Sequence, residues 1–130
     1  MAALSLDPYI VDVSTAHTLF GTLAAARTEI AAFAYLDRDG RLLGMRHIQG
    51  VGVDSVDVSI RRVVADVLAF DAAAVLMAHN HPSGSPRPST ADRETTRRLL
   101  LALEPIGVRL LDHLVLARDA SASFLALGWL

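Results

Sequence analysis

The chain has 130 residues, no cysteine, and 12 basic against 14 acidic side chains, so its formal net charge is −2. This balance gives no overall attraction for nucleic acid or for an anionic membrane. The absence of cysteine excludes disulfides, thiolate zinc ligands and a cysteine nucleophile, and a catalytic lysine is excluded because every basic residue is arginine.

The predicted elements alternate between helices and strands. In chain order they are a helix over 14–27, a strand over 30–36, a turn over 37–40, a strand over 41–49, a loop over 50–57, a helix over 58–68, a strand over 73–78, a loop over 79–88, a helix over 89–104, and strands over 108–117 and 121–127. Ser14 and Ser89 are the expected N-caps of the first and last helices. The pattern predicts a single α/β domain over residues 1–130, with a mixed sheet and helices on its faces.

Two histidines follow the most apolar of the predicted strands. If the extended backbone continues, the spacing of His79 and His81 points both imidazoles to one side, beyond the carboxyl end of the strand. A loop with three prolines then leads to Ser89 and Asp92 at the start of a helix. Two neutral imidazoles and one carboxylate leave a fourth position open, which is typical of a catalytic zinc site. We therefore predict that His79, His81 and Asp92 bind one zinc ion per chain.

Each of these residues also has a structural interpretation. Ser89 and Asp92 have the spacing of a capping box, which is compatible with metal binding by the same aspartate. The two histidines on their own could be hydrogen-bonded loop residues.

A hydrolase also needs a general base, and the chain has three glutamates. Glu94 points about 200° around its helix from Asp92, and Glu104 lies at the far end of that helix. Glu29 is left as the candidate, at a junction between a helix and a strand. Its alternative role is that of a solvated helix terminus.

Other candidate residues carry weaker signals. The histidines His17 and His47 have no partner spacing and are expected in the core or on the surface. The pair Asp112–His113 fits either orientation of a metal ligand or a structural role within a strand. Three arginines on the last predicted helix favour a solvated face over a phosphate-binding site: Arg93, Arg97 and Arg98. Trp129, near the C-terminus, is expected to be a packing anchor or an interface residue.

Three motifs resemble the RadC-like branch of the JAB/MPN (JAMM) metalloprotease superfamily: His79-Asn-His-Pro-Ser-Gly84, Pro88-Ser-x-x-Asp92 and Leu111-Asp-His-Leu114. The similarity runs from about residue 5 to the C-terminus. It implies an α/β/α sandwich like that of cytidine deaminases. It also implies zinc on His79, His81 and Asp92, with Glu29 as general acid/base and Ser89 stabilising the oxyanion.

Two features depart from the wider superfamily. Peptidase members carry serine or threonine between the histidines, where this chain has Asn80 as the RadC-like branch does. Longer RadC-like proteins have an N-terminal helix-hairpin-helix region, for which we expect no room in this chain.

The expected function is zinc-dependent hydrolysis of peptide or isopeptide amide bonds, with a peptide or protein as substrate. The alternative is a non-catalytic, metal-bearing binding module associated with DNA repair, which the net charge does not favour. A nucleoside deaminase of the related fold is a third, poorly supported alternative, because its cysteine ligands are absent. The sequence start has no basic signal-peptide region, and no apolar run approaches the roughly 18 residues of a membrane-spanning helix. We therefore expect a cytoplasmic protein with no membrane partner.

Overall fold

A computed structural model describes residues 18–50 and 58–130. The expected N-cap Ser14, His17 and most of the predicted loop at 50–57 lie outside the described residues. Residues 18–20 are helical and lead through a turn into the short 3-10 helix η1 (Leu23–Ala25). The backbone is already extended at Ala26, so the first helix ends before residue 27, where the sequence placed its end.

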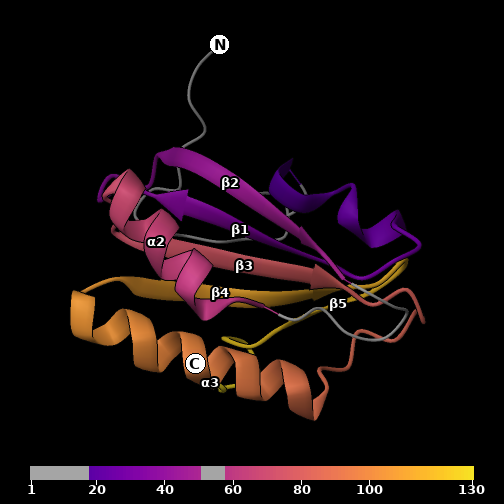
Figure 1. Ribbon diagram of the computed structural model, residues 1–130. Coiled ribbons are helices and arrows are strands. Elements are labelled where there is room, and N and C mark those ends of the chain that lie inside the picture. The colour runs from indigo at the N-terminus through magenta and orange to yellow at the C-terminus, as the bar shows by residue number, and fades with distance from the viewer. Residues whose placement is uncertain (1–17, 51–57) are drawn as a thin grey trace.

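Five strands form one mixed sheet in the order β2-β1-β3-β4-β5 (Figure 1). The strands are β1 (Ile30–Leu36), β2 (Leu42–Gln49), β3 (Ala74–Asn80), β4 (Arg109–Leu116) and β5 (Ser121–Ser123). Strands β3 and β4 pair in parallel, and every other pair is antiparallel. The predicted mixed sheet is confirmed.

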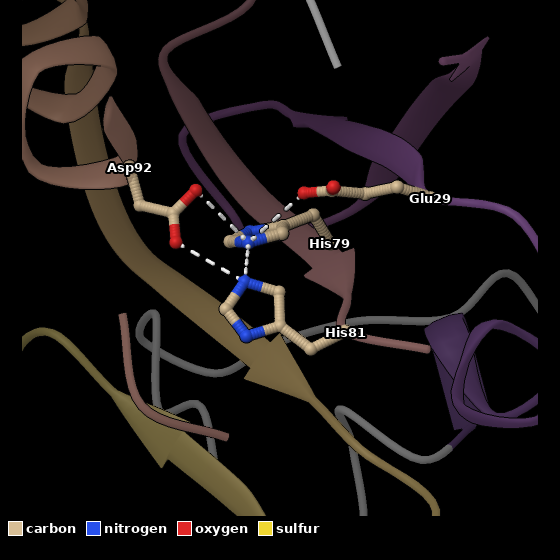
Figure 2. A group of neighbouring side chains, drawn as sticks. All are labelled: Glu29, His79, His81 and Asp92. Carbon is tan, nitrogen blue, oxygen red and sulfur yellow. Dashed lines mark hydrogen bonds and ion pairs between the residues drawn. The ribbon is translucent and has the colours of Figure 1, made fainter. Parts of the chain in front are cut away.

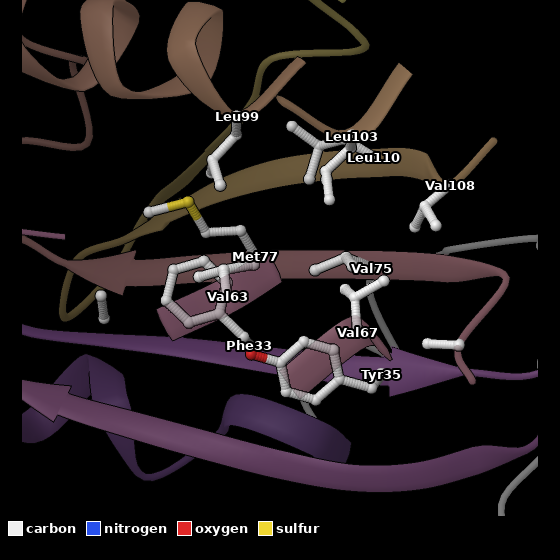
Figure 3. Close-up of a cluster of buried hydrophobic side chains, with 12 residues drawn as sticks. Phe33, Tyr35, Val63, Val67, Val75, Met77, Leu99, Leu103, Val108 and Leu110 are labelled. Atoms are coloured by element: carbon white, nitrogen blue, oxygen red, sulfur yellow. The ribbon is translucent and has the colours of Figure 1, made fainter. Parts of the chain in front are cut away.

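Helices cover both faces of the sheet, because its central strands are apolar on both sides. Within β1, alternate side chains enter two separate cores, Ala32 and Ala34 on one face and Phe33 and Tyr35 on the other. The first core is closed by residues of the N-terminal helical segment, and the second by α2 (Ile60–Phe70) and α3 (Thr90–Leu103), as Figure 3 shows. The predicted α/β fold with helices on both faces is therefore confirmed.

Two strand ends differ from the predicted ones by two residues or more. Strand β3 continues through Asn80, two residues beyond the predicted end, because the pairing with β4 persists to that point. Strand β5 ends at Ser123 instead of residue 127. The carboxylate of Asp112 accepts hydrogen bonds from the Ser123 hydroxyl and the Leu125 amide, which turns the chain away from the sheet.

The helix ends also follow local chemistry. The Ser59 side chain caps α2 by accepting from the amide of Arg62, so the helix starts two residues later than predicted. Helix α3 starts after Ser89 as predicted, and the 3-10 helix η2 (Glu104–Ile106) follows it. In the part of the chain that is described, no helix has the length and apolar character needed to cross a bilayer.

Candidate metal site

Four side chains converge where β3 ends and β1 begins. Because β1 and β3 are antiparallel, the residue before β1 lies beside the last residues of β3, and Ala31 pairs with His79. The ligand atoms of four side chains lie within 4.8 Å of one another, and we call this group the His–carboxylate cluster (Figure 2). Its members are Glu29, His79, His81 and Asp92.

The two imidazoles turn their Nε2 atoms toward the carboxylates. The Nε2 atoms of His79 and His81 are 2.9 Å apart, and each lies 3.2 Å from one carboxylate oxygen of Asp92. The other ring nitrogens are already bonded, that of His79 to His113 at 2.6 Å and that of His81 to the carbonyl of Ser85 at 2.9 Å. Nitrogen and carboxylate donors around one point fit a divalent metal ion such as zinc.

Asp92 has a second task at the start of α3. Its amide donates to the Ser89 hydroxyl at 3.0 Å, and its carboxylate accepts from the Ser89 amide at 2.7 Å, which completes a capping box. The other carboxylate oxygen faces His79. Burial raises the pKa of the Asp92 carboxyl, but His79, when its Nε2 carries a proton, and the hydrogen bonds from Ser89 lower this pKa by more, so it lies below its ordinary value of 3.8. Capping thus leaves an ionised carboxylate facing the cluster.

Glu29 is buried, and its carboxylate oxygen lies 3.7 Å from Nε2 of His79. The segment that carries it is tied to β3 by Asn80. The Asn80 amide oxygen accepts from the Ile30 amide at 2.6 Å, and its nitrogen donates to the carbonyls of Ala26 and Thr28 at 3.2 and 2.9 Å. Glu29 is therefore not a solvated helix terminus.

Asn80 is a residue whose part in the site the sequence analysis missed. It stands between the two histidines and points to the opposite side, as alternation in a strand requires. Its side chain is fully buried, and a buried amide has to find hydrogen-bond partners. That requirement was the available signal, but the sequence does not say which segment supplies the partners.

The Asp112–His113 pair divides between two roles. The His113 ring is fully buried and bonds His79. The carboxylate of Asp112 instead holds the C-terminal turn through Ser123 and Leu125. Thr96, which the sequence analysis did not single out, lies 2.6 Å from the other nitrogen of His113.

The remaining candidates lie outside the cluster. Glu94 pairs with Arg97 at 2.7 Å on an exposed face of α3. The guanidinium of Arg93 lies 4.2 Å from the centre of the Trp129 ring, which packs edge-on against Phe124. Trp129 is therefore a packing anchor. Three further candidates are exposed: His47, Arg98 and Glu104.

Comparison with known proteins places the chain in a family. The family model of the RadC-like JAB domain matches residues 11–129. A UPF0758 protein of Xanthomonas axonopodis pv. citri is 39% identical over 131 residues, which cover all of this chain and 58% of that protein. A UPF0758 protein of Vibrio cholerae is 44% identical over 108 residues, or 83% of this chain and 68% of that protein. One of Xylella fastidiosa is 40% identical over 130 residues, or 99% of this chain and 58% of the relative.

These matches confirm the resemblance drawn from the sequence motifs. The chain spans a little over half the length of two of the relatives named above. The name UPF0758 states no activity, substrate or partner for any of them.

Proposed function

The chain belongs to the RadC-like JAB domain family, and from this premise we propose that it is a zinc-dependent hydrolase of peptide or isopeptide amide bonds. The observation that carries the proposal is a buried carboxylate, Glu29, beside three other potential metal ligands. His79, His81 and Asp92 would hold the zinc ion. When bound, zinc supplies Lewis acidity, which acidifies a water molecule and polarises a carbonyl oxygen.

Glu29 acts in this proposal as general acid/base. Its carboxylate accepts a proton from the water that attacks the carbonyl carbon, and then donates that proton to the nitrogen of the leaving amine. Two features support this role: the side chain is buried against the cluster, and Asn80 fixes the backbone on either side of it.

Ser89 stabilises the oxyanion in this proposal. Its hydroxyl oxygen accepts a hydrogen bond from the Asp92 amide in the helix cap, so the hydroxyl hydrogen remains available to donate to another group. A hydroxyl at this position donates to the carbonyl oxygen of the substrate as negative charge develops there. The substrate class is a peptide or a protein whose amide carbonyl reaches the exposed start of α3.

The test is the substitution Glu29→Gln in the full chain. We expect hydrolysis of fluorogenic peptides or lysine-isopeptide-linked peptides to fall by about 10²–10⁴-fold, the usual contribution of a positioned acid/base. Zinc affinity should remain that of the wild type, because Glu29 is not a ligand in this mechanism. Glu94→Gln, the same change on an exposed face of α3, is the matched control and should keep the full rate.

Two results would contradict the proposal in different ways. A Glu29→Gln variant that hydrolyses a proven substrate at the wild-type rate would remove Glu29 from the mechanism. Zinc binding by the wild type without hydrolysis of any amide in the panel would favour the metal-bearing binding module instead.

A further inference from the structure

A chain of hydrogen bonds runs from the metal site into α3. Nδ1 of His79 lies 2.6 Å from Nε2 of His113, and Nδ1 of His113 lies 2.6 Å from the hydroxyl of Thr96. The Thr96 hydroxyl donates to the backbone carbonyl of Asp92 at 3.1 Å. All three side chains are buried, with exposed fractions of 2%, 0% and 2% for His79, His113 and Thr96. Water therefore does not compete for these bonds.

The positions of the protons follow from the last bond of the chain. A hydroxyl has one hydrogen, and that of Thr96 is given to the Asp92 carbonyl, so the oxygen accepts from Nδ1–H of His113. Nε2 of a neutral His113 then carries a lone pair and accepts from Nδ1–H of His79.

We propose that His113 and Thr96 are positioning residues that hold His79 as its Nδ1–H tautomer and so keep Nε2 bare for the metal ion. If the hydrogen bonds ran in the opposite direction, a neutral His79 would carry its hydrogen on Nε2, and that nitrogen could not then bind a metal. His81 is prepared in the same way, because its Nδ1–H donates to the Ser85 carbonyl. Two lone pairs and a carboxylate then face one another and favour a cation between them.

This inference rests on the metal site of the proposed function but not on the hydrolytic step. It assigns to the family motif at Leu111–Leu114 a specific task in the site. The parallel register supports this task, since His113 pairs with Met77 on β3, and His79 lies two residues further along the same face. The imidazole of His113 also stacks on Phe124, which fixes its plane.

The first test compares two substitutions at one position. Thr96→Val removes the hydroxyl and keeps the shape of the side chain, whereas Thr96→Ser keeps the hydroxyl and removes a methyl group. We expect the Kd for zinc, measured by competition with a chromophoric chelator, to rise about 10–100-fold in Thr96→Val, the usual loss when a partner of a ligand is removed. Thr96→Ser should bind zinc as the wild type does. Equal affinities of the two variants would overturn the proposal.

The second test needs no substitution and no metal. In ¹⁵N-labelled, metal-free wild type we expect a scalar coupling across the hydrogen bond between Nδ1 of His79 and Nε2 of His113, with the proton attached to His79. A proton attached to Nε2 of His113, or the absence of the coupling, would overturn the proposal even if the Thr96 variants fail to fold. A wild type with this coupling that binds no zinc would contradict the proposed function and leave the tautomer assignment supported.

Discussion

Two polar clusters lie at opposite ends of β1, and they differ in the charges that surround their carboxylates. At the far end from the His–carboxylate cluster, Arg46 donates to both carboxylate oxygens of Asp66, and the Tyr35 hydroxyl donates to the same group at 2.9 Å. We call these three residues the arginine cluster. Its carboxylate has a permanent cation as partner, whereas those of the His–carboxylate cluster face imidazoles.

The electrostatics of the arginine cluster follow from this partner. The hydrogen bonds from Arg46 are the main cause that lowers the pKa of Asp66. Burial raises the pKa of Tyr35, and Asp66 raises it further. A carboxylate paired with arginine is already neutralised and serves the fold. A carboxylate whose ring partners are imidazoles has no permanent cation beside it there, so a cation from outside the chain can stabilise it, as expected of a candidate metal site.

The largest expected effect is on zinc binding. The double variant His79→Ala, His81→Ala should lose tight binding of one zinc ion per chain, because two of the three proposed ligands are gone. Metal content after dialysis, measured by mass spectrometry, checks this. Stoichiometric zinc at unchanged affinity in the double variant would show that the ion binds elsewhere. Chelation of the wild type should leave the fold intact, since the apolar cores do not depend on the metal.

The next effect concerns the segment that carries Glu29. Asn80→Ser shortens the side chain that bonds Ile30, Ala26 and Thr28, so Glu29 should shift relative to the cluster. Misplacement of a catalytic group by about 1 Å can lower a rate by about 10²-fold. We expect kcat on an amide substrate to fall by about that factor while zinc affinity is retained. An unchanged kcat would mean that Glu29 is held by other contacts.

A smaller effect should separate the arginine cluster from the metal site. Asp66→Ala leaves the Tyr35 hydroxyl without its acceptor, and an unsatisfied buried polar group costs about 1–3 kcal/mol in the free energy of unfolding. Urea denaturation measures this loss. The Kd for zinc should not change. A parallel loss of zinc affinity would mean that the two ends of β1 are coupled and that the arginine cluster does not serve the fold alone.

The smallest effect is a pH dependence. The pKa of Asp66 lies below its ordinary value of 3.8, so the unfolded chain takes up a proton at this carboxyl before the folded chain does. Asp66 therefore contributes stability above about pH 4, and this contribution is lost as the pH falls further. Urea midpoints between about pH 6 and pH 3 should fall less steeply in Asp66→Asn than in the wild type. Parallel curves for the two proteins would contradict this assignment.

The features of the site that depend on residues close together in the sequence could be predicted. The spacing of two in His79 and His81 was enough to place both rings on one side, and the spacing of three in Ser89 and Asp92 predicted the capping box. Elimination among the three glutamates was the only route from the sequence to Glu29. Its contact with the histidines depends on the antiparallel pairing of strands about 50 residues apart, which no local pattern reveals.

Other parts of the site depend on register alone. His113 meets His79 through the parallel pairing of β3 with β4, which no local pattern in the sequence reveals. The apolar residues after Ser123 were predicted as strand because their composition suits one. The buried carboxylate of Asp112 instead accepts a hydrogen bond from the backbone amide of Leu125. Whether that amide bonds the carboxylate or a neighbouring strand is decided only in the folded chain.

The double use of Asp92 has a kinetic consequence. One carboxylate oxygen accepts a hydrogen bond from the amide of Ser89, the N-cap of α3, and the other oxygen faces His79. Helix ends fray on fast timescales, and local opening of the first turn would carry this carboxylate away from the imidazoles. In the proposed site, the residence time of the metal ion is therefore tied to how often that turn opens. A bound ion should in return slow amide hydrogen exchange in the first turn of α3, so exchange at that helix end reports occupancy.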